Sequence, residues 1–377
     1  MKSYDYIFTG TGAAAWSVLL RMLDAGLVNN KKVLLIDRSP KVHNDRTWCF
    51  WEERAGYFES IIHHQWDTLS FHSDTLSRNL DLDAYRYKMI RGVDFYAHAQ
   101  ERISGLDNIE QRYGQVEWVE EANGMTLLLD GAPIDSTGAL VFNSIPPPTK
   151  ADPAAIDLLQ HFKGWLIETP TPVFDPGKAT LMDFRVSQKE GATFIYVLPV
   201  SPTKALVEYT LFTEQLLSNE QYEQGLKDYI AQYLSLENYS IVEEEFGIIP
   251  MTTRRFPFFH KGVYHLGTAG GQTKASTGYT FQFIQKQAEY MVSCLTQRQS
   301  LPHTWPAPAR FHFYDKVLLR LLQKKQPTGS AIFTRLFERN KASAIFRFLD
   351  NETSLAQEIR IMSTLQIGAF FRAAVRM

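Results

Sequence analysis

Residues 4–37 read YDYIFTGTGAAAWSVLLRMLDAGLVNNKKVLLID and decide the fold. A short apolar run at residues 6–9 leads into the glycine-rich turn 10–15, and a helical pattern follows to about Leu27. A second apolar run, residues 33–36, ends at Asp37. This order predicts a βαβ unit with the G-x-G-x-x-A form of the dinucleotide-binding fingerprint.

Each residue of the fingerprint has a predicted role. Gly10 allows the tight turn after the strand, and Gly12 lacks a Cβ, so a pyrophosphate can approach the backbone. Ala13 opens the helix, whose free N–H groups face the phosphates, and Ala15 is small enough for the helix to pack on the sheet. Asp37 follows Gly12 by 25 residues and ends the second strand, where a carboxylate can accept both ribose hydroxyls.

The position of this unit favours FAD over NAD(P) as the tightly held nucleotide. The βαβ unit begins at residue 4, an arrangement that is commoner in FAD proteins than in nicotinamide dehydrogenases. The alternative interpretation is a glycine-rich turn in some other α/β protein.

Composition indicates a soluble two-domain enzyme. The chain has 377 residues, of which 13% are aromatic, so we expect either an aromatic-rich core or a long apolar pocket lined with rings. Cys49 and Cys294 have no metal-binding or disulfide spacing, and we expect no metal. We also expect no secretory signal, no membrane-spanning helix and a cytoplasmic location.

The last part of the chain is basic. Residues 301–377 hold 12 Lys and Arg against 5 Asp and Glu, and they predict helices with apolar and cationic positions interleaved. Two interpretations stay open: an amphipathic bundle packed on the core, or peripheral docking on the cytoplasmic membrane surface. Without a nucleic-acid motif, we expect no nucleic-acid partner.

The middle of the chain predicts an inserted antiparallel sheet with strands near residues 162–167, 179–186, 193–199 and 204–212. A second strand and glycine cluster, Gly267, Gly270 and Gly271 within residues 263–271, then leads into a helix from about Ser276 to Leu295. This element is typical of two-domain flavoproteins, where it returns to the nucleotide domain. The expected fold class is therefore α/β: a discontinuous FAD-binding Rossmann-like domain (1–160 and 255–300), a substrate-binding domain (161–254) and a helical C-terminal region (301–377).

Short segments spread over nearly the whole chain complete the pattern: 44–51 (NDRTWCFW), 174–176 (FDP), 179–185 (ATLMDFR), 205–210 (ALVEYT), 247–251 (GIIPM), 267–271 (GTAGG), 276–279 (STGY) and 348–354 (FLDNETS). Their types and order resemble the carotenoid lycopene cyclases. The resemblance implies a bacterial-type, peripheral membrane lycopene β-cyclase that folds the ends of linear lycopene into β-ionone rings, giving γ-carotene and then β-carotene. It also implies reduced FAD as the active cofactor, NAD(P)H as its reductant and no net redox change.

Through this resemblance Glu208 becomes the predicted acid that protonates the terminal double bond, and Arg46 becomes a flavin-binding residue. The period-2 pattern places Glu208 between apolar strand neighbours, an isolated carboxyl whose pKa burial would raise. Candidate rings for contact with the carbocation are Tyr196, Tyr209 and Phe281.

The sequence departs from the family at two positions. Tyr209 stands where a second adjacent acid is common, and Thr268 stands where related flavoproteins carry an Asp for the ribityl chain. Two other classes also remain open: a redox flavoprotein, such as an aromatic-ring monooxygenase or a polyprenyl reductase, and a flavoprotein that binds carotenoid without changing it.

Overall fold

The predicted βαβ unit is present at the start of the chain. The computed structural model describes residues 4–44, 46–122, 124–146 and 152–375. Strand β1 (Tyr6–Thr9) pairs in parallel with β2 (Val33–Asp37), and helix α1 (Ala13–Asp24) connects them. Consecutive side chains of both strands are buried, so the sheet is covered on both faces.

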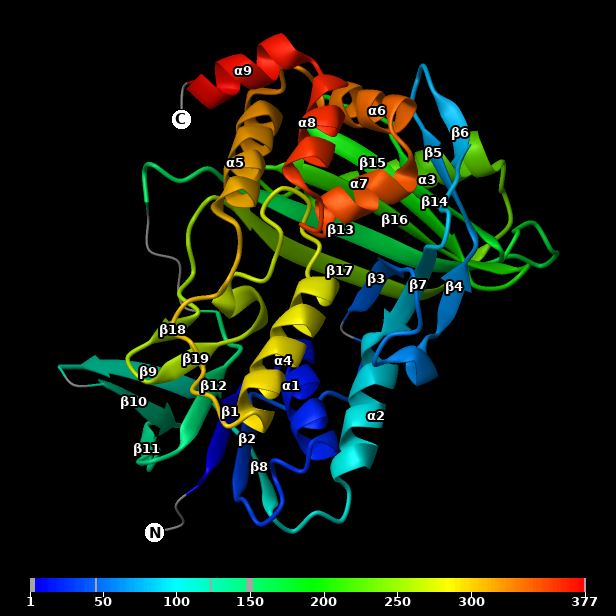
Figure 1. The fold of residues 1–377 in the computed structure, drawn as a ribbon. Helices are drawn as coiled ribbons and strands as arrows, with labels where there is room; N and C mark the ends of the chain where they lie inside the picture. The colour runs from blue at the N-terminus through cyan, green and yellow to red at the C-terminus, as the bar shows by residue number, and fades with distance from the viewer. Residues whose placement is uncertain (1–3, 45, 123, 147–151, 376–377) are drawn as a thin grey trace.

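The unit belongs to a mostly parallel six-stranded sheet (Figure 1). Its order is β18 (Phe259–His260), β19 (Val263–His265), β12 (Leu140–Asn143), β1, β2 and β8 (Ile109–Tyr113). β19 pairs in parallel with β12, which confirms that the late strand and glycine cluster return to this sheet. The 3₁₀ turn Gly267–Gly270 follows β19.

Helices cover one face of this sheet and a small sheet covers the other (Figure 1). Helix α4 (Phe281–Thr296) lies against α1, where Gln285 Nε2 donates to Ser17 Oγ over 3.1 Å, and α2 (Gly92–Ile103) packs beside α1. On the opposite face, apolar side chains of the three-stranded sheet pack on β1 and β2. That sheet contains β11 (Ala132–Ile134), β10 (Gly124–Leu129) and β9 (Val116–Glu121).

The second large sheet has seven strands and contains the four strands predicted from the middle of the chain. Its order is β17 (Ser240–Thr252), β13 (Asp157–Glu168), β16 (Lys204–Thr213), β15 (Ala192–Pro199), β14 (Lys178–Asp183), β5 (Thr68–His72) and β6 (Ser77–Leu80). All neighbours are antiparallel except β14 and β5. Because β5 and β6 join this sheet, it extends beyond the range 161–254; the domain division itself stays a prediction.

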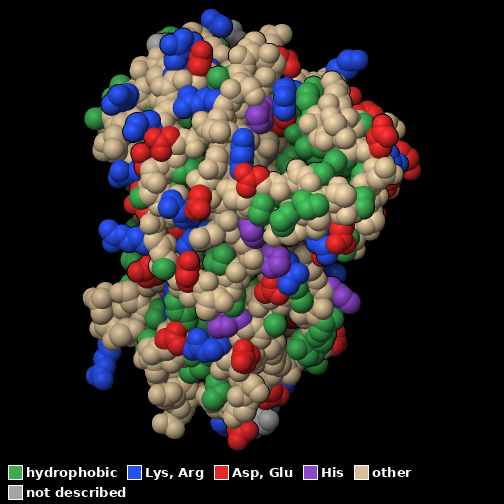
Figure 2. Space-filling model, turned by 90° about the vertical axis from the view of Figure 1, so that its right-hand side faces the viewer, with side chains coloured by type: hydrophobic (Ala, Val, Ile, Leu, Met, Phe, Trp, Pro, Cys, Tyr) green, Lys and Arg blue, Asp and Glu red, His purple; other side chains and the backbone are tan. Residues whose placement is uncertain are grey.

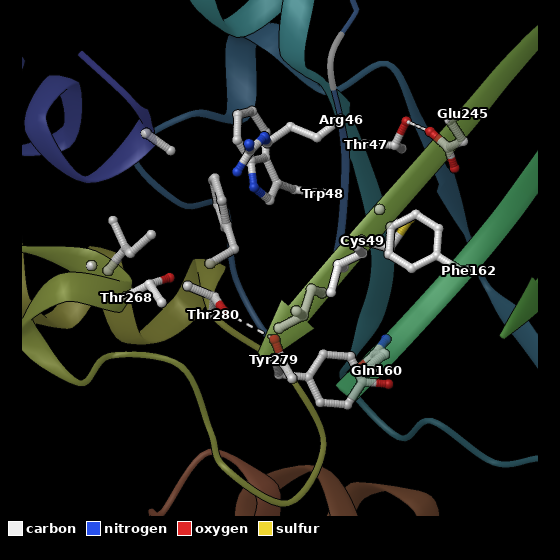
Figure 3. A pocket seen from close by; sticks show the side chains of 18 of the residues that line it. Arg46, Thr47, Trp48, Cys49, Gln160, Phe162, Glu245, Thr268, Tyr279 and Thr280 are labelled. Atoms are coloured by element: carbon white, nitrogen blue, oxygen red, sulfur yellow. Dashed lines mark hydrogen bonds between the residues drawn. The ribbon is translucent and has the colours of Figure 1, made fainter. Parts of the chain in front are cut away.

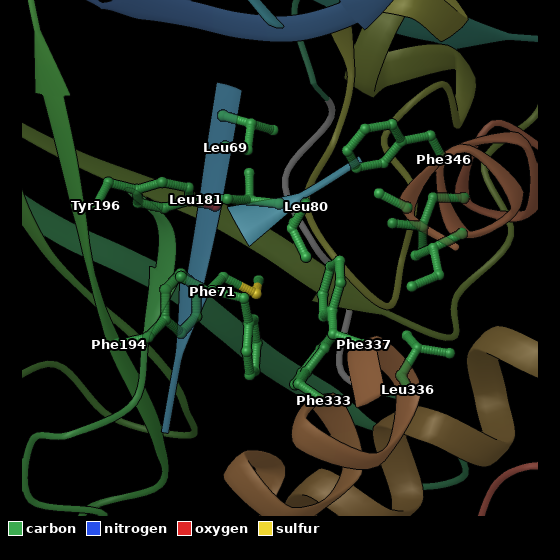
Figure 4. Close-up of a cluster of buried hydrophobic side chains, with 14 of the residues drawn as sticks. Leu69, Phe71, Leu80, Leu181, Phe194, Tyr196, Phe333, Leu336, Phe337 and Phe346 are labelled. Atoms are coloured by element: carbon green, nitrogen blue, oxygen red, sulfur yellow. The ribbon is translucent and has the colours of Figure 1, made fainter. Parts of the chain in front are cut away.

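Helices α5 (Ala309–Lys324), α6 (Gly329–Arg339), α7 (Ala342–Leu349) and α8 (Leu355–Ser363) cover one face of the seven-stranded sheet, and α9 (Ile367–Val375) packs on α5. Phe333, Phe337 and Phe346 are buried in one cluster with Phe71 and Phe194 of the sheet (Figure 4). The tail therefore packs on the core, as one interpretation predicted. Helix α3 (Asn219–Tyr229), with Ser218 as its N-cap, covers the other face.

A short sheet lies between the two large sheets (Figure 1). It consists of β3 (Thr47–Glu52), β7 (Arg86–Arg91) and β4 (His64–Trp66). Lys and Arg side chains gather in the upper half of the face shown in Figure 2, at the height of the C-terminal helices in Figure 1. Among the described residues, no helix combines the length and apolarity that crossing a bilayer requires.

The late helix begins at Phe281, five residues after the predicted start at Ser276. Residues 274–279 instead form a closed loop, because Lys274 N–H donates to the Tyr279 carbonyl and Gly278 N–H donates to the Lys274 carbonyl, both over 2.8 Å. Gly278 has a φ of +72°, a conformation that ends helical geometry. This loop carries Thr277 and Tyr279 to the cavity described next.

Candidate active site

A cavity of about 400 Å³ lies between the two large sheets. On one side it is bounded by the start of α1 and the late glycine turn, and on the other by β13, β16 and β17. Five of the predicted site residues line it: Gly12, Ala13, Arg46, Glu208 and Gly267. The others do not line it: Gly10, Ala15, Asp37, Gly270 and Gly271.

The glycine-rich turn leaves open space where the fingerprint predicts a phosphate. Gly10 has a φ of +77°, and a Cβ there would lie 2.5 Å from Ser144 Oγ, so only glycine fits the turn. A Cβ on Gly12 would meet no atom within 4 Å. No side chain caps the N-terminus of α1, which leaves its first N–H groups available to an anion.

The late glycine turn closes against the start of α1. Gly267 has a φ of +57°, and a Cβ there would lie 2.8 Å from Ala14 Cβ. Gly270 is equally restricted, since its Cβ would lie 2.2 Å from the His265 carbonyl oxygen, and Gly271 has a φ of +76°. These glycines shape the turn and bring it beside the first helix.

Asp37 ends β2 as predicted, and its carboxylate bonds to the glycine-rich loop. Its Oδ2 accepts hydrogen bonds from the backbone N–H and the hydroxyl of Thr11, at 2.7 and 2.8 Å. Its Oδ1 accepts one from Arg38 N–H, at 2.6 Å. A carboxylate has about four acceptor positions, so one remains for a ribose hydroxyl rather than the two expected.

Aromatic residues form the wall between the cofactor side and the strand side. Figure 3 shows Arg46 and Trp48 between the turn that carries Thr268 and the strand that carries Glu245. Trp48 packs on Phe281 with ring centroids 5.9 Å apart. Thr268 stands where related flavoproteins carry an Asp. Its hydroxyl oxygen lies 2.9 Å from the hydroxyl oxygen of Thr273, so the two form a hydrogen bond.

Glu208 projects from β16 into the cavity, where Thr210 Oγ1 donates a hydrogen bond of 2.7 Å to its Oε1. Burial, and after it the charge of Glu245, raises the pKa of Glu208 well above its ordinary value. The sequence predicted an isolated carboxyl, and that prediction was wrong, because Glu245 shares the cavity.

Glu245 reaches Glu208 across a glycine. On β13, Gly164 pairs with Glu208 of β16 on one side and with Glu245 of β17 on the other. A Cβ on Gly164 would lie 2.9 Å from Glu245 Cγ and 3.1 Å from its Oε1. The missing side chain therefore leaves the space in which the two carboxyls meet.

Each carboxyl of the pair is held by one threonine. Thr47 Oγ1 donates to Glu245 Oε2 over 2.8 Å (Figure 3), which parallels the bond from Thr210 to Glu208. The second oxygen of Glu245, Oε1, is buried and has no hydrogen-bond partner. Burial raises the pKa of Glu245, whereas the hydrogen bond from Thr47 and the nearby Glu208 carboxyl lower it.

The sequence carried only a weak signal for Glu245. It lies in the run Glu243-Glu244-Glu245, directly before the recognised segment 247–251, and a period-2 pattern separates its face from that of Glu244. The partner across Gly164 depends on strand order and register, which the sequence alone did not supply.

Of the predicted aromatic contacts, Tyr196 and Phe281 line the cavity. Tyr209 faces away from it and packs under α3, where a Cβ on Gly225 would lie 2.7 Å from its ring. Asp183 does not line the cavity either. It is buried and bonds to Arg185 and to the Tyr229 hydroxyl.

The comparisons agree with this geometry. The profile of a family described as "Lycopene cyclase protein" matches residues 5–375. A lycopene beta-cyclase of Pantoea ananas is 24% identical over 261 residues, covering 66% of this chain and 63% of that protein, just under two thirds of its length. A lycopene beta-cyclase of Pseudescherichia vulneris is 23% identical over 414 residues, covering 98% of this chain and 97% of that protein.

Solved structures show the same fold. A geranylgeranyl bacteriochlorophyll reductase-like protein of Thermoplasma acidophilum has a TM-score of 0.61 at 12% identity, with both chains covered completely. A flavoprotein/dehydrogenase of Cytophaga hutchinsonii has a TM-score of 0.63 at 11% identity, covering 100% of this chain and 99% of that one. The α/β fold with a Rossmann-like FAD-binding sheet is thus confirmed, and the family match across nearly the whole chain shows that the protein belongs to the lycopene cyclase family.

Proposed function

We propose that this protein is a lycopene β-cyclase, which converts the linear ends of lycopene into β-ionone rings by acid catalysis without net oxidation. The observation that carries the proposal is a half-buried, protonatable Glu208 in a cavity that opens onto a glycine cradle. The family match and the two relatives named lycopene beta-cyclase support the same reaction.

The proposed cofactor is FAD, active in its reduced form, with NAD(P)H as the reductant. The open space at Gly12, the uncapped start of α1 and the turn at Gly267 fit a dinucleotide at this end of the cavity. Arg46 would lie beside its ring system, and Asp37 would accept one ribose hydroxyl. When bound, reduced FAD supplies a fixed negative charge that stabilises a nearby cation.

Glu208 performs the proton chemistry in this proposal. Its O–H bond breaks as a C–H bond forms at the terminal double bond, and a carbocation remains on the neighbouring carbon. The inner double bond closes the ring, and loss of one ring proton leaves the new double bond. Proton uptake equals proton release, so the reaction is an isomerisation.

Peripheral binding to the cytoplasmic membrane surface is part of the proposal, because lycopene is apolar. Leu355 and Ile359 on α8 are 56% and 57% exposed, and Phe371 and Val375 on α9 are 67% and 69% exposed. Each pair is spaced by four residues and so shares one helix face. These apolar faces lie on the basic C-terminal region, as expected for docking on an anionic surface.

The competing function is that of a redox flavoprotein. One of the solved structures of similar fold is a reductase-like protein. Expression in a lycopene-accumulating bacterium, followed by pigment chromatography, tests ring formation directly. With purified protein, we expect far less than one NAD(P)H consumed per ring and full replacement of NAD(P)H by dithionite. Consumption of one NAD(P)H per product would identify a redox enzyme, and unchanged lycopene with bound pigment would identify a carotenoid carrier.

A further inference from the structure

We propose that Glu208 and Glu245 hold a single proton between them across Gly164, and that Glu245 is the positioning residue that keeps Glu208 protonated. The pairing stands on the geometry alone, whereas its catalytic consequence rests on the proposed cyclase function.

The strand register brings the two carboxyls together. Gly164 is the common partner of Glu208 and Glu245 in the two ladders of β13. Neighbouring strands lie about 4.8 Å apart, so side chains two strands apart meet only if the middle position is empty. Gly164 provides that gap, since its Cβ would lie 2.9 Å from Glu245 Cγ and 3.1 Å from Leu206 Cδ1.

The hydrogen bonds indicate where the proton lies. Thr210 donates to Glu208 Oε1 and Thr47 donates to Glu245 Oε2, so one oxygen of each carboxyl is already satisfied. Glu245 Oε1 is buried without a donor, and a buried acceptor left unpaired is costly. A proton on Glu208 fills this position, because the O–H of one acid can donate to the carboxylate of the other.

Apart from Arg46, the other ionisable groups that line the cavity with the pair are uncharged at neutral pH. Burial raises the pKa of Cys49, Tyr87, Tyr196 and Tyr279, so these groups stay uncharged at neutral pH. Glu243, two residues away on β17, adds negative charge and bonds to Asn44. Arg46 is the cation that lines the same cavity.

The pair suits the proposed reaction. A carboxylate beside Glu208 disfavours a second negative charge, so Glu208 retains its proton at a pH where an ordinary Glu has lost it. When Glu208 passes that proton to the substrate, Glu245 adds negative charge close to the newly formed cation. The proton later lost from the ring balances the one donated, and the pair returns to its one-proton state.

The test compares Glu245→Gln with Glu245→Asp and with a matched control, Glu244→Gln. Glu244 adjoins Glu245 but faces the other side of the sheet and is exposed, and Lys163 keeps its bond to Glu223 when Glu244 is lost. In Glu245→Gln, the alkaline limb of the pH–rate profile should move to lower pH by roughly one unit or more, because a like charge next to Glu208 has gone. Glu245→Asp should restore part of this shift, and Glu244→Gln should leave the profile unchanged.

A second measurement needs no activity. Infrared difference spectra of wild type against Glu208→Gln should show a protonated carboxyl band at neutral pH, with a titration midpoint that falls in Glu245→Gln. A missing band, or midpoints that agree in wild type and Glu245→Gln, would overturn the proton-sharing pair. A band that behaves as expected in a protein without cyclase activity would instead leave the pair standing and refute the proposed function.

Discussion

Trp51 and Asp350 are joined by a hydrogen bond of 2.6 Å, from Nε1 of the indole to Oδ2 of the carboxyl, although 299 positions separate them in the chain. The bond ties β3 to the end of α7, so it fastens the C-terminal helices to the short sheet beside the cavity. Burial raises the pKa of Asp350 to about 7, although Lys286 and the bond from Trp51 lower it.

Asp350→Asn should change how stability depends on pH. Folded Asp350 keeps its proton up to about pH 7, whereas the unfolded chain releases it near pH 4. In that window the folded state binds more protons, so the free energy of unfolding falls as pH rises, by up to about 4 kcal/mol. We expect the stability of Asp350→Asn relative to wild type to rise between about pH 4 and about pH 7, measured by urea unfolding. Glu237→Gln, at an exposed glutamate outside the surroundings of Asp350, is the control, and parallel curves for wild type and Asp350→Asn would contradict the assignment.

Gly164→Ala should disturb the acid pair while the protein stays folded. The new methyl group would press on Glu245 Cγ and Oε1 and on Leu206 Cδ1, which are flexible side-chain atoms that can move aside. We expect an unfolding midpoint near that of wild type, and cyclisation reduced by roughly 10-fold or more, because small displacements of catalytic groups are costly. Wild-type turnover in this variant would show that the spacing of the two carboxyls is not critical.

Glu208→Gln should abolish ring formation but keep flavin and lycopene binding. The amide preserves the size of the side chain and removes its transferable proton, a loss of roughly 10²-fold or more for general acid catalysis. Glu208→Asp, one methylene shorter, should also be badly impaired. Product analysis by chromatography decides the question, and near-normal β-carotene synthesis by folded, flavin-bound Glu208→Gln would remove Glu208 from the mechanism.

Gly12→Val should block the nucleotide without harming the fold. The position has an extended backbone, φ −79° and ψ −179°, and open space around a Cβ, so the valine would project toward the expected pyrophosphate. The flavin absorbance of the purified protein should disappear. Gly124→Val is a matched control, since a Cβ there also meets no atom within 4 Å, on the distant three-stranded sheet. A full flavin spectrum in Gly12→Val would mean that the fingerprint is misassigned.

Membrane docking should depend on the exposed apolar residues of α8 and α9. Ile359→Ser and Phe371→Ser should weaken binding to anionic liposomes, and salt should weaken it further, because surface charge is screened over about 10 Å at 0.1 M. The control is Phe370→Ser, which removes a ring that packs partly against the core. Equal partition into neutral and anionic vesicles at every salt concentration would contradict electrostatic docking.

The sequence predicted those parts of the molecule that local chemistry determines. The βαβ unit and the four antiparallel strands are present, because hydrophobic periodicity acts over a few positions. The start of α4 was misplaced, since Gly278 closes a loop there. Glu245 and the role of Gly164 were missed, because they depend on which strands become neighbours.

The register of β13 with β16 and β17 therefore determines whether Glu208 and Glu245 can meet. The extra residue in the β13–β17 ladder, between the pairs Leu166–Glu243 and Ile167–Ile241, is a bulge that can absorb a change of chain length before Glu243. No such irregularity occurs between Glu245 and Thr252, where the pairing with β13 is continuous. A one-residue insertion in that span would turn Glu245 to the opposite face of the sheet. Such a chain would retain every residue of the cavity and still lose its acid pair. In an alignment of related chains, a gap inside this span would therefore indicate loss of the pair as directly as a substitution at Glu208.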